Sequence, residues 1–212
     1  MKLYNYWRSG ASWRVRNALA LKGLSFEYVA VNLLSGEQHA TAHRARNPAG
    51  YVPVLEISEE GRVEQLTQSV AILEYLEEMH PAPPLLPENP VARAKVRGLV
   101  ELMNSGIQPF HNLSTINSVK ELGGDPKLWA QKYLRSGLAA LEQLAGPVAG
   151  QFLFGESPTF ADCCLVPQLY GARRFGVEAQ EFPLLARIEA ACLSREPFKR
   201  AHADAQPDAV PV

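Results

Sequence analysis

The sequence has few cysteines, no long apolar run and no excess of charge of either sign. Its three cysteines are Cys163, Cys164 and Cys192, an odd number with two adjacent, and this pattern fits neither a disulfide framework nor a zinc site. No segment approaches the ~18 uninterrupted apolar residues of a membrane-spanning helix. The first residues, MKLYNYWRSG, lack the apolar stretch of a secretory signal. We therefore expect a reduced, soluble, cytoplasmic protein that binds no metal.

The charges of the chain nearly cancel, in total and locally. The 21 Lys and Arg residues oppose 22 Asp and Glu residues, for a net charge of -1. Residues 1–80 hold 8 basic and 9 acidic side chains, and residues 91–212 hold 13 and 12. A nucleic-acid-binding face or a polybasic membrane anchor needs a local basic excess. We therefore expect neither nucleic acid nor a membrane among the partners.

A proline-rich segment divides the 212 residues into two parts. Five prolines lie in PAPPLLPENP, residues 81–90, and because proline removes a backbone donor and stops helices we expect an extended linker there. The part before it predicts a small α/β domain with a mixed sheet. Its strands are expected at 3–7, 26–31, 52–57 and 63–66, with a turn at 59–61, and its helices at 12–22, 42–46 and 69–80. The part after it predicts an all-helical domain, with helices at 91–104, 128–144, 159–170 and 184–193.

Three short segments carry polar groups suited to binding an anion. The loop at residues 7–12 places Ser9 and Ser12 at the start of a helix, where hydroxyls, free amides and the helix dipole favour negative charge. A simple helix cap explains the same serines. Gln68 and Ser69 begin another helix and suit a carboxylate, or again a cap. In the third segment, residues 47–54, Pro53 begins a strand, and spacing alone favours a trans bond before it.

Together these segments resemble a known family. WRSGASWRVRNALALKG, NPAGYVPVL and QSVAILEYLEE are similar to the glutathione-binding domain of the glutathione transferases, in particular the zeta class, which includes maleylacetoacetate isomerase. The similarity continues through residues 106–114, 158–168, 172–177 and 206–208 and so covers nearly the whole chain. It implies a thioredoxin-like domain at 1–80 that binds glutathione, the linker at 81–90, and a helical substrate-binding domain at 91–212.

The resemblance also implies roles for individual residues. Ser9 matches the serine that hydrogen-bonds the glutathione sulfur, within a loop completed by Gly10, Ala11 and Ser12. Val52 matches a backbone partner of the tripeptide, and Pro53 the family's cis-proline. Gln68 and Ser69 match the pair at the γ-glutamyl end, and Gln38 a contact near the glycyl end. Gln108, Asn112 and Ser114 match helical-domain positions that face the active site and are expected to bind glutathione. Arg8 and Arg174 match arginines whose planar charge suits substrate carboxylates.

The loop departs from the family at two positions. The zeta pattern reads Ser-Ser-Cys-Ser, whereas this chain reads Ser9-Gly10-Ala11-Ser12. No protein thiol is therefore available in the loop for mixed-disulfide chemistry. Activation of the glutathione thiol remains with Ser9.

The expected activity is glutathione-dependent cis–trans isomerisation of maleylacetoacetate to fumarylacetoacetate, a step of tyrosine catabolism, alongside glutathione transferase activity. Maleylpyruvate isomerisation and glutathione transfer to α-halo acids are the alternatives within the enzyme class. A non-catalytic transferase-like binding module is the alternative outside it. The resemblance further implies a homodimer.

Other residues are given plainer interpretations. Cys163 and Cys164 lie in an apolar helix and are expected to be buried structural thiols. Thr159 and Asp162 form a T-x-x-D capping box. His111 is expected to line a pocket, and Arg14 and Arg16 are expected to be surface or interface charges.

Overall fold

The computed structural model describes residues 1–59 and 61–210, and the chain divides into two compact units. Unit 1 comprises residues 1–84 and the chain from Arg195 onward, and unit 2 comprises Leu85–Ser194. The C-terminal segment thus differs from the expected boundaries, which gave residues 91–212 to the helical domain. Its physical ties are to unit 1, where Arg16 Nε donates to the Ala201 carbonyl at 3.2 Å. The expected turn at 59–61 includes Glu60, which lies outside the described residues.

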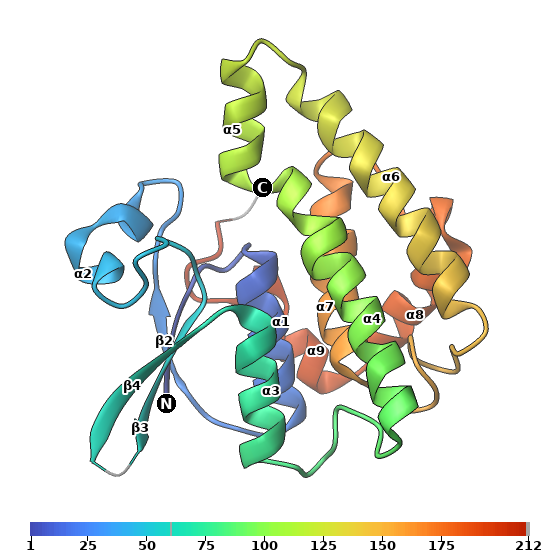
Figure 1. Ribbon diagram of the computed structural model, residues 1–212, viewed down its shortest axis with the longest axis horizontal. Helices are drawn as coiled ribbons and strands as arrows, with labels where there is room; N and C mark the ends of the chain where they lie inside the picture. Colours follow the sequence, from blue (N-terminus) through green and yellow to red (C-terminus); the bar gives the residue numbers. More distant parts are fainter. Residues whose placement is uncertain (60, 211–212) are drawn as a thin grey trace. The chain divides into compact units, whose positions relative to one another are not determined.

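Unit 1 is built on a four-stranded mixed sheet (Figure 1). The strands are β1 (Lys2–Asn5), β2 (Glu27–Ala30), β3 (Val54–Glu59) and β4 (Arg62–Thr67), in the order β2-β1-β3-β4. β1 pairs parallel with β2, and the other two pairs are antiparallel. A parallel pair needs a crossover connection, which α1 (Gly10–Leu21) provides. The expected α/β domain is confirmed.

The helices of unit 1 bury an apolar core against the sheet. α1 and α3 (Ser69–Met79) lie side by side, and α9 (Glu196–Ala201) packs on α1 (Figure 1). α2 (Thr41–Arg44) is a single short turn. Fully buried side chains from the strands and helices form the core, among them Leu3, Leu55, Trp13, Leu19, Ile72 and Leu76.

A buried lysine joins α1 to α3 within unit 1. Lys22 Nζ donates to Glu77 Oε2 at 2.7 Å. It also donates to the carbonyls of His80, at 2.6 Å, and Pro83, at 3.0 Å. Its three donors therefore have three acceptors, which offsets the desolvation of the buried charge. The first half of the proline-rich segment, which was expected to be an extended linker, is thus fastened to unit 1.

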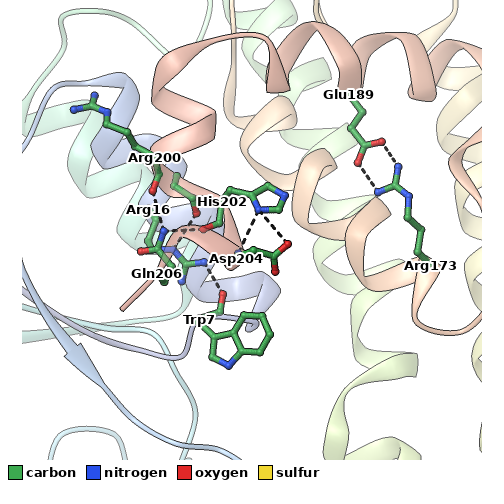
Figure 2. A network of polar contacts seen from close by, with 9 residues as sticks. Trp7, Arg16, Arg173, Glu189, Arg200, His202, Asp204 and Gln206 are labelled. Carbon is green, nitrogen blue, oxygen red and sulfur yellow. Dashed lines mark hydrogen bonds and ion pairs between the residues drawn. The ribbon is translucent and has the colours of Figure 1, made fainter. Parts of the chain in front are cut away.

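Unit 2 is all-helical. Its helices are α4 (Pro90–Gly106), α5 (Leu113–Glu121), α6 (Pro126–Ala145), α7 (Phe160–Arg173) and α8 (Pro183–Leu193). α7 packs against α4 and α8 and is buried on nearly every side, as expected for a helix that is apolar all round. Arg173 and Glu189 form an ion pair that joins α7 to α8 (Figure 2). Within residues 1–59 and 61–210, no helix has the length and apolarity required to span a membrane.

Two helices were not expected from the sequence, α5 and α9. α5 has apolar residues at helical spacing, Leu113, Ile116 and Val119, so its pattern could have predicted a helix, although none of its nine residues is buried. α9 spans only six residues. The second half of the proline-rich segment is fastened to unit 2, because Leu85 and Leu86 are buried there and the Leu85 carbonyl accepts the Phe160 N–H at 3.0 Å.

The expected capping box at the start of α7 is confirmed and includes a fully buried carboxyl group. Asp162 accepts from the backbone and hydroxyl of Thr159, at 2.7 and 3.0 Å, and from the Leu153 N–H at 2.7 Å. Burial raises the pKa of Asp162 to about 6, because desolvation outweighs these hydrogen bonds, which favour the carboxylate.

This raised pKa predicts a pH-dependent stability. Between the ordinary pKa of 3.8 and the folded pKa of about 6, the native state binds more protons than the unfolded state. The stabilising contribution is therefore complete below the unfolded pKa and is lost as the pH rises through the folded pKa. We expect the free energy of unfolding to fall by on the order of 3 kcal/mol from this group between about pH 4 and pH 7.

Urea denaturation across that range tests the prediction. Asp162→Asn should lack this component of the pH dependence. The matched control is Asp125→Asn, which changes an exposed carboxylate that caps α6. This variant should retain the pH dependence that comes from Asp162. Equal pH profiles for the wild type and Asp162→Asn would contradict the assignment.

Candidate active site

The register of the sheet brings three of the candidate segments of unit 1 to one edge. Tyr4, near the end of β1, pairs with Val54 at the start of β3. Val54 in turn pairs with Thr67 at the end of β4. The loop after β1, the Val52–Pro53 bond and the Gln68–Ser69 pair therefore meet at the same edge.

The first segment of this edge is the loop that leads into α1. The Ser9 N–H donates to the Tyr6 carbonyl at 3.0 Å, which closes a tight turn. Ser9 is the N-cap of α1, and its Oγ accepts the Ser12 N–H at 3.3 Å. A hydroxyl that accepts one hydrogen bond still has its O–H to donate. The cap interpretation and the anion-binding interpretation of Ser9 are therefore compatible.

A cation lies beside this loop. The Arg8 guanidinium sits over the Trp7 ring, 5.1 Å from its centroid. Arg8 is partly exposed, whereas Trp7 is buried. An arginine stacked on an indole loses little freedom when it binds a carboxylate, because the ring already restricts it.

The expectation that Arg14 and Arg16 are surface or interface charges is wrong, because both are buried within the chain. Each is 1% exposed. Arg14 Nη1 donates to the Ser69 hydroxyl at 3.3 Å and so links α1 to the start of α3. Arg16 donates to Asn5 Oδ1 at 2.9 Å and to the Trp7 carbonyl at 2.7 Å. Backbone and side-chain acceptors from distant segments make their burial tolerable, and local sequence does not reveal such partners.

The second segment is the loop before β3. The Val52–Pro53 bond is cis, as the resemblance implies. Two buried side chains hold the Tyr51 carbonyl just before it: His43 Nε2 at 2.9 Å and Asn47 Nδ2 at 3.0 Å. The backbone that would pair with a peptide ligand is therefore fixed in place.

Gln38 reaches the same loop from a short 3-10 turn, Glu37–His39. A Cβ added at Gly50, which has φ +68°, would lie 3.1 Å from the Gln38 carbonyl. Only glycine suits both the close approach and the backbone conformation. Gln38 itself is 9% exposed.

The third segment is the start of α3. Ser69 is the first residue of the helix, and the N-cap position belongs to Gln68, so the expectation that Ser69 is the cap is wrong. Gln68 has φ +68° and ψ 113°, and it is the one non-glycine residue with positive φ among the described residues. Its side chain makes no capping hydrogen bond. The N-terminal amides of α3 are thus without a side-chain cap, which suits a carboxylate ligand.

Three buried polar atoms near these segments test whether a glutathione-like ligand fits. Ser12 Oγ, Gln38 Oε1 and His43 Nδ1 are among the described side-chain atoms that are buried without a hydrogen-bond partner. A buried polar group usually has a partner, so such atoms indicate a ligand or water. A tripeptide with two carboxylates and two peptide groups has the donors and acceptors to match. The residues of unit 1 therefore fit glutathione.

The remaining candidates lie in unit 2. Gln108 is in a 3-10 turn, Gln108–His111, and Asn112 and Ser114 lie at the start of α5, where both are exposed. Arg174 is the exposed C-cap of α7. His111 connects these regions, since its Nε2 lies 2.9 Å from Gln168 Nε2 on α7 and its ring lies 5.9 Å from that of Phe175. The candidates of unit 2 thus gather at one end of that unit.

A thioredoxin-like sheet with a cis-proline loop, followed in one chain by a helical unit, defines the glutathione transferase fold. Comparison with known proteins agrees. Residues 1–78 match the model of the glutathione S-transferase N-terminal domain, and residues 42–203 match that of the C-terminal domain.

Individual relatives are similar over their whole length. Maleylacetoacetate isomerase of Pseudomonas aeruginosa is 44% identical and covers 98% of both chains. A crystal structure of maleylacetoacetate isomerase from Anaeromyxobacter dehalogenans, with glutathione bound in the active site, is 52% identical, with a TM-score of 0.92 over 99% of this chain and 97% of that one. A holo structure of a bacterial zeta-class maleylpyruvate isomerase is 42% identical, with a TM-score of 0.93 over 99% and 100%. The chain therefore belongs to the glutathione S-transferase family, in the zeta-class branch of the maleylacetoacetate isomerases.

Three residues that shape the site were not among the sequence candidates. His43 and Asn47 hold the cis-proline loop, and Arg14 reaches Ser69. Asn47 begins the NPAGYVPV segment and could have been singled out there. His43 and Arg14 carry no local signal, because their partners are eight and 55 positions away.

The strained backbone of Gln68 gives a prediction that separates stability from binding. Gln68→Gly should relieve the positive φ and raise the free energy of unfolding by about 1 kcal/mol, net of the greater flexibility of the unfolded chain. It should also weaken glutathione binding roughly tenfold, since the side-chain amide of Gln68 is lost. Urea denaturation and titration calorimetry measure the two effects.

The matched control is Gln68→Ala, which loses the same amide but keeps the strain. It should bind glutathione as weakly as Gln68→Gly and show no gain in stability. A glycine variant less stable than the alanine variant would contradict the strain argument.

Proposed function

We propose that this protein is a glutathione-dependent cis–trans isomerase of a maleyl diacid, with maleylacetoacetate as the leading substrate and fumarylacetoacetate as the product. The main observation behind this proposal is the edge of unit 1, where Ser9, the cis Val52–Pro53 bond and the uncapped start of α3 meet. Buried polar atoms without a hydrogen-bond partner lie near these segments. The isomerase relatives and the glutathione-bound structure support it.

Unit 1 holds the coenzyme in this proposal. The Val52 backbone binds the peptide part, Gln68 and Ser69 bind the γ-glutamyl end, and Gln38 binds near the glycyl end. Gly10, Ala11 and Ser12 supply the first turn of α1, whose amides and dipole favour negative charge. When bound, glutathione supplies a sulfur nucleophile that can add reversibly to a cis double bond and so permit rotation.

Ser9 is the residue assigned to the sulfur. Its Oγ accepts from the Ser12 N–H, which orients the hydroxyl and leaves its proton to donate. A hydrogen bond to the charged form of a thiol lowers its pKa, so Ser9 favours the thiolate at neutral pH. Ala11 supplies no thiol of its own, so the chemistry depends on that of the coenzyme.

Arg8 and Arg174 are assigned to the substrate carboxylates, and Gln108, Asn112 and Ser114 of unit 2 to the binding of glutathione. The chain as a whole has a net charge of -1, so attraction for a dianion must come from these local cations and from helix N-termini. Guanidinium groups bind carboxylates with two parallel hydrogen bonds, which fixes orientation as well as charge.

Maleylpyruvate isomerisation is the second candidate, supported by the 42%-identical zeta-class enzyme. Glutathione transfer to α-halo acids and a non-catalytic binding role are the further alternatives, and activity assays distinguish them. We also propose that the protein is a cytoplasmic homodimer serving aromatic amino-acid catabolism. Light scattering that gives the mass of a single chain would contradict the dimer.

Side-by-side assays of maleylacetoacetate and maleylpyruvate, with and without glutathione, test the function. Ser9→Ala should lower kcat/KM about 100-fold, the effect expected when a donor to a developing or bound anion is lost. Ser9→Gly should lose activity equally, although glycine keeps most of the cap stability, so that the loss cannot be assigned to unfolding.

Ser58→Ala, which changes an exposed serine of β3, is the matched control and should retain full activity. Glutathione binding without turnover of either acid or of a halo acid would favour the non-catalytic role. Full activity of Ser9→Gly would overturn the assignment of Ser9.

A further inference from the structure

The C-terminal segment of unit 1 reaches back to the loop that carries Arg8 and Ser9. Asp208 Oδ2 accepts the backbone N–H of Trp7 at 3.1 Å. Asp208 Oδ1 accepts the hydroxyl of Tyr28, which follows β1 and α1 in the chain and lies in β2. A carboxylate 201 positions away in sequence thus binds the peptide that leads directly into the proposed sulfur-binding loop.

The same loop is held from its other side by Arg16. Its Nη2 donates to the Trp7 carbonyl at 2.7 Å, as Figure 2 shows, and its Nη1 donates to the Tyr6 carbonyl at 3.3 Å. Asp208 and Arg16 therefore bind the N–H and the carbonyl of Trp7 respectively. Both polar groups of the Trp7 backbone, directly before Arg8, are hydrogen-bonded, which restricts the rotation of this part of the loop.

The segment that carries Asp208 is itself fixed. We define residues 195–208 as the C-terminal clasp. Gln206 Nε2 donates to the carbonyls of Arg200, at 2.8 Å, and His202, at 2.7 Å, which closes the clasp on itself (Figure 2). The His202 ring stands edge-on to Trp13 of α1, with centroids 4.7 Å apart. These contacts hold Asp208 at a defined position beside the loop.

Tyr28, which donates to Asp208, and Arg16, whose charge acts on Asp208, both stay protonated at neutral pH. Burial, and next the hydrogen bond to Asp208, raise the pKa of the Tyr28 hydroxyl well above its ordinary value. Burial lowers the pKa of Arg16 to about 10, which leaves the guanidinium protonated at pH 7. Arg16 and Asp208 attract one another, so the clasp and the loop are coupled electrostatically as well as by hydrogen bonds.

We propose that Asp208 is a positioning residue for the glutathione site, holding the Trp7–Ser9 loop in the geometry in which Ser9 both caps α1 and presents its O–H to the sulfur. This inference rests on the proposed function of Ser9. A loop released from Asp208 would spend a smaller fraction of time in the binding-competent arrangement, and the apparent Kd rises by the inverse of that fraction.

The test compares Asp208→Ala with Asp204→Ala, which removes an exposed carboxylate from the same clasp. Asp208→Ala should accelerate amide hydrogen exchange in residues 4–9 of the ligand-free protein. It should raise the glutathione Kd roughly tenfold by calorimetry, the size expected for a lost hydrogen bond to a charged group. It should also raise the pKa of the bound glutathione thiol, read from thiolate absorbance against pH. Asp204→Ala should change none of the three, and Asp208→Glu should restore them in part.

Two results would overturn the proposal. Unchanged exchange in residues 4–9 would show that Asp208 does not hold the loop. Faster exchange with an unchanged glutathione Kd and thiol pKa would show that the clasp only stabilises the fold. Should Asp208→Ala fail to fold, Tyr28→Phe removes one bond to the same carboxylate, and about a threefold rise in Kd is expected from it. Absence of isomerase turnover in the wild type would refute the proposed function without altering these binding and exchange measurements.

Discussion

The buried guanidinium of Arg16 is the constraint on which much of unit 1 depends. A charge that is 1% exposed is costly unless its donors are satisfied, and here the acceptors come from two segments far apart in sequence: Asn5 Oδ1 with the carbonyls of Tyr6 and Trp7, and the carbonyl of Ala201 in α9. Because one planar guanidinium donates to all of these acceptors, its burial fixes the loop after β1 and the C-terminal clasp at the same time.

The polar edge of unit 1 follows from the same geometry. α1 begins where Arg16 and the turn from Tyr6 to Ser9 direct it, and Arg14, two residues before Arg16, reaches across to Ser69 at the start of α3. The N-termini of two helices, α1 and α3, are therefore held at one edge of the sheet, where Arg14 links them. The N-terminal amides of α3 have no side-chain cap, and this favours an anion on a chain whose net charge is -1.

The sequence predicts the periodic parts of this structure and the motif-bearing loops, but not the long-range polar contacts. Strands and helices with a clear apolar pattern, such as β3 and α4, lie where alternation or helical spacing places them. α5 was not predicted because it is only nine residues long, although Leu113, Ile116 and Val119 lie at helical spacing in it. The burial of Arg16 could not be predicted, since a charged residue normally indicates surface and its partner Ala201 is 185 positions away.

The substitutions in the loop explain why such distant contacts matter here. Gly10 and Ala11 stand where the zeta pattern has serine and cysteine, so neither position offers a polar side chain to brace the loop. Ser9 is then oriented by its own helix cap, in which its Oγ accepts the Ser12 N–H, and by bonds to the loop backbone: its N–H to the Tyr6 carbonyl, and the two polar groups of Trp7 to Arg16 and Asp208. Because Gly10 and Ala11 have no polar side chains to make such bonds, the shape of the loop depends on the contacts of its backbone.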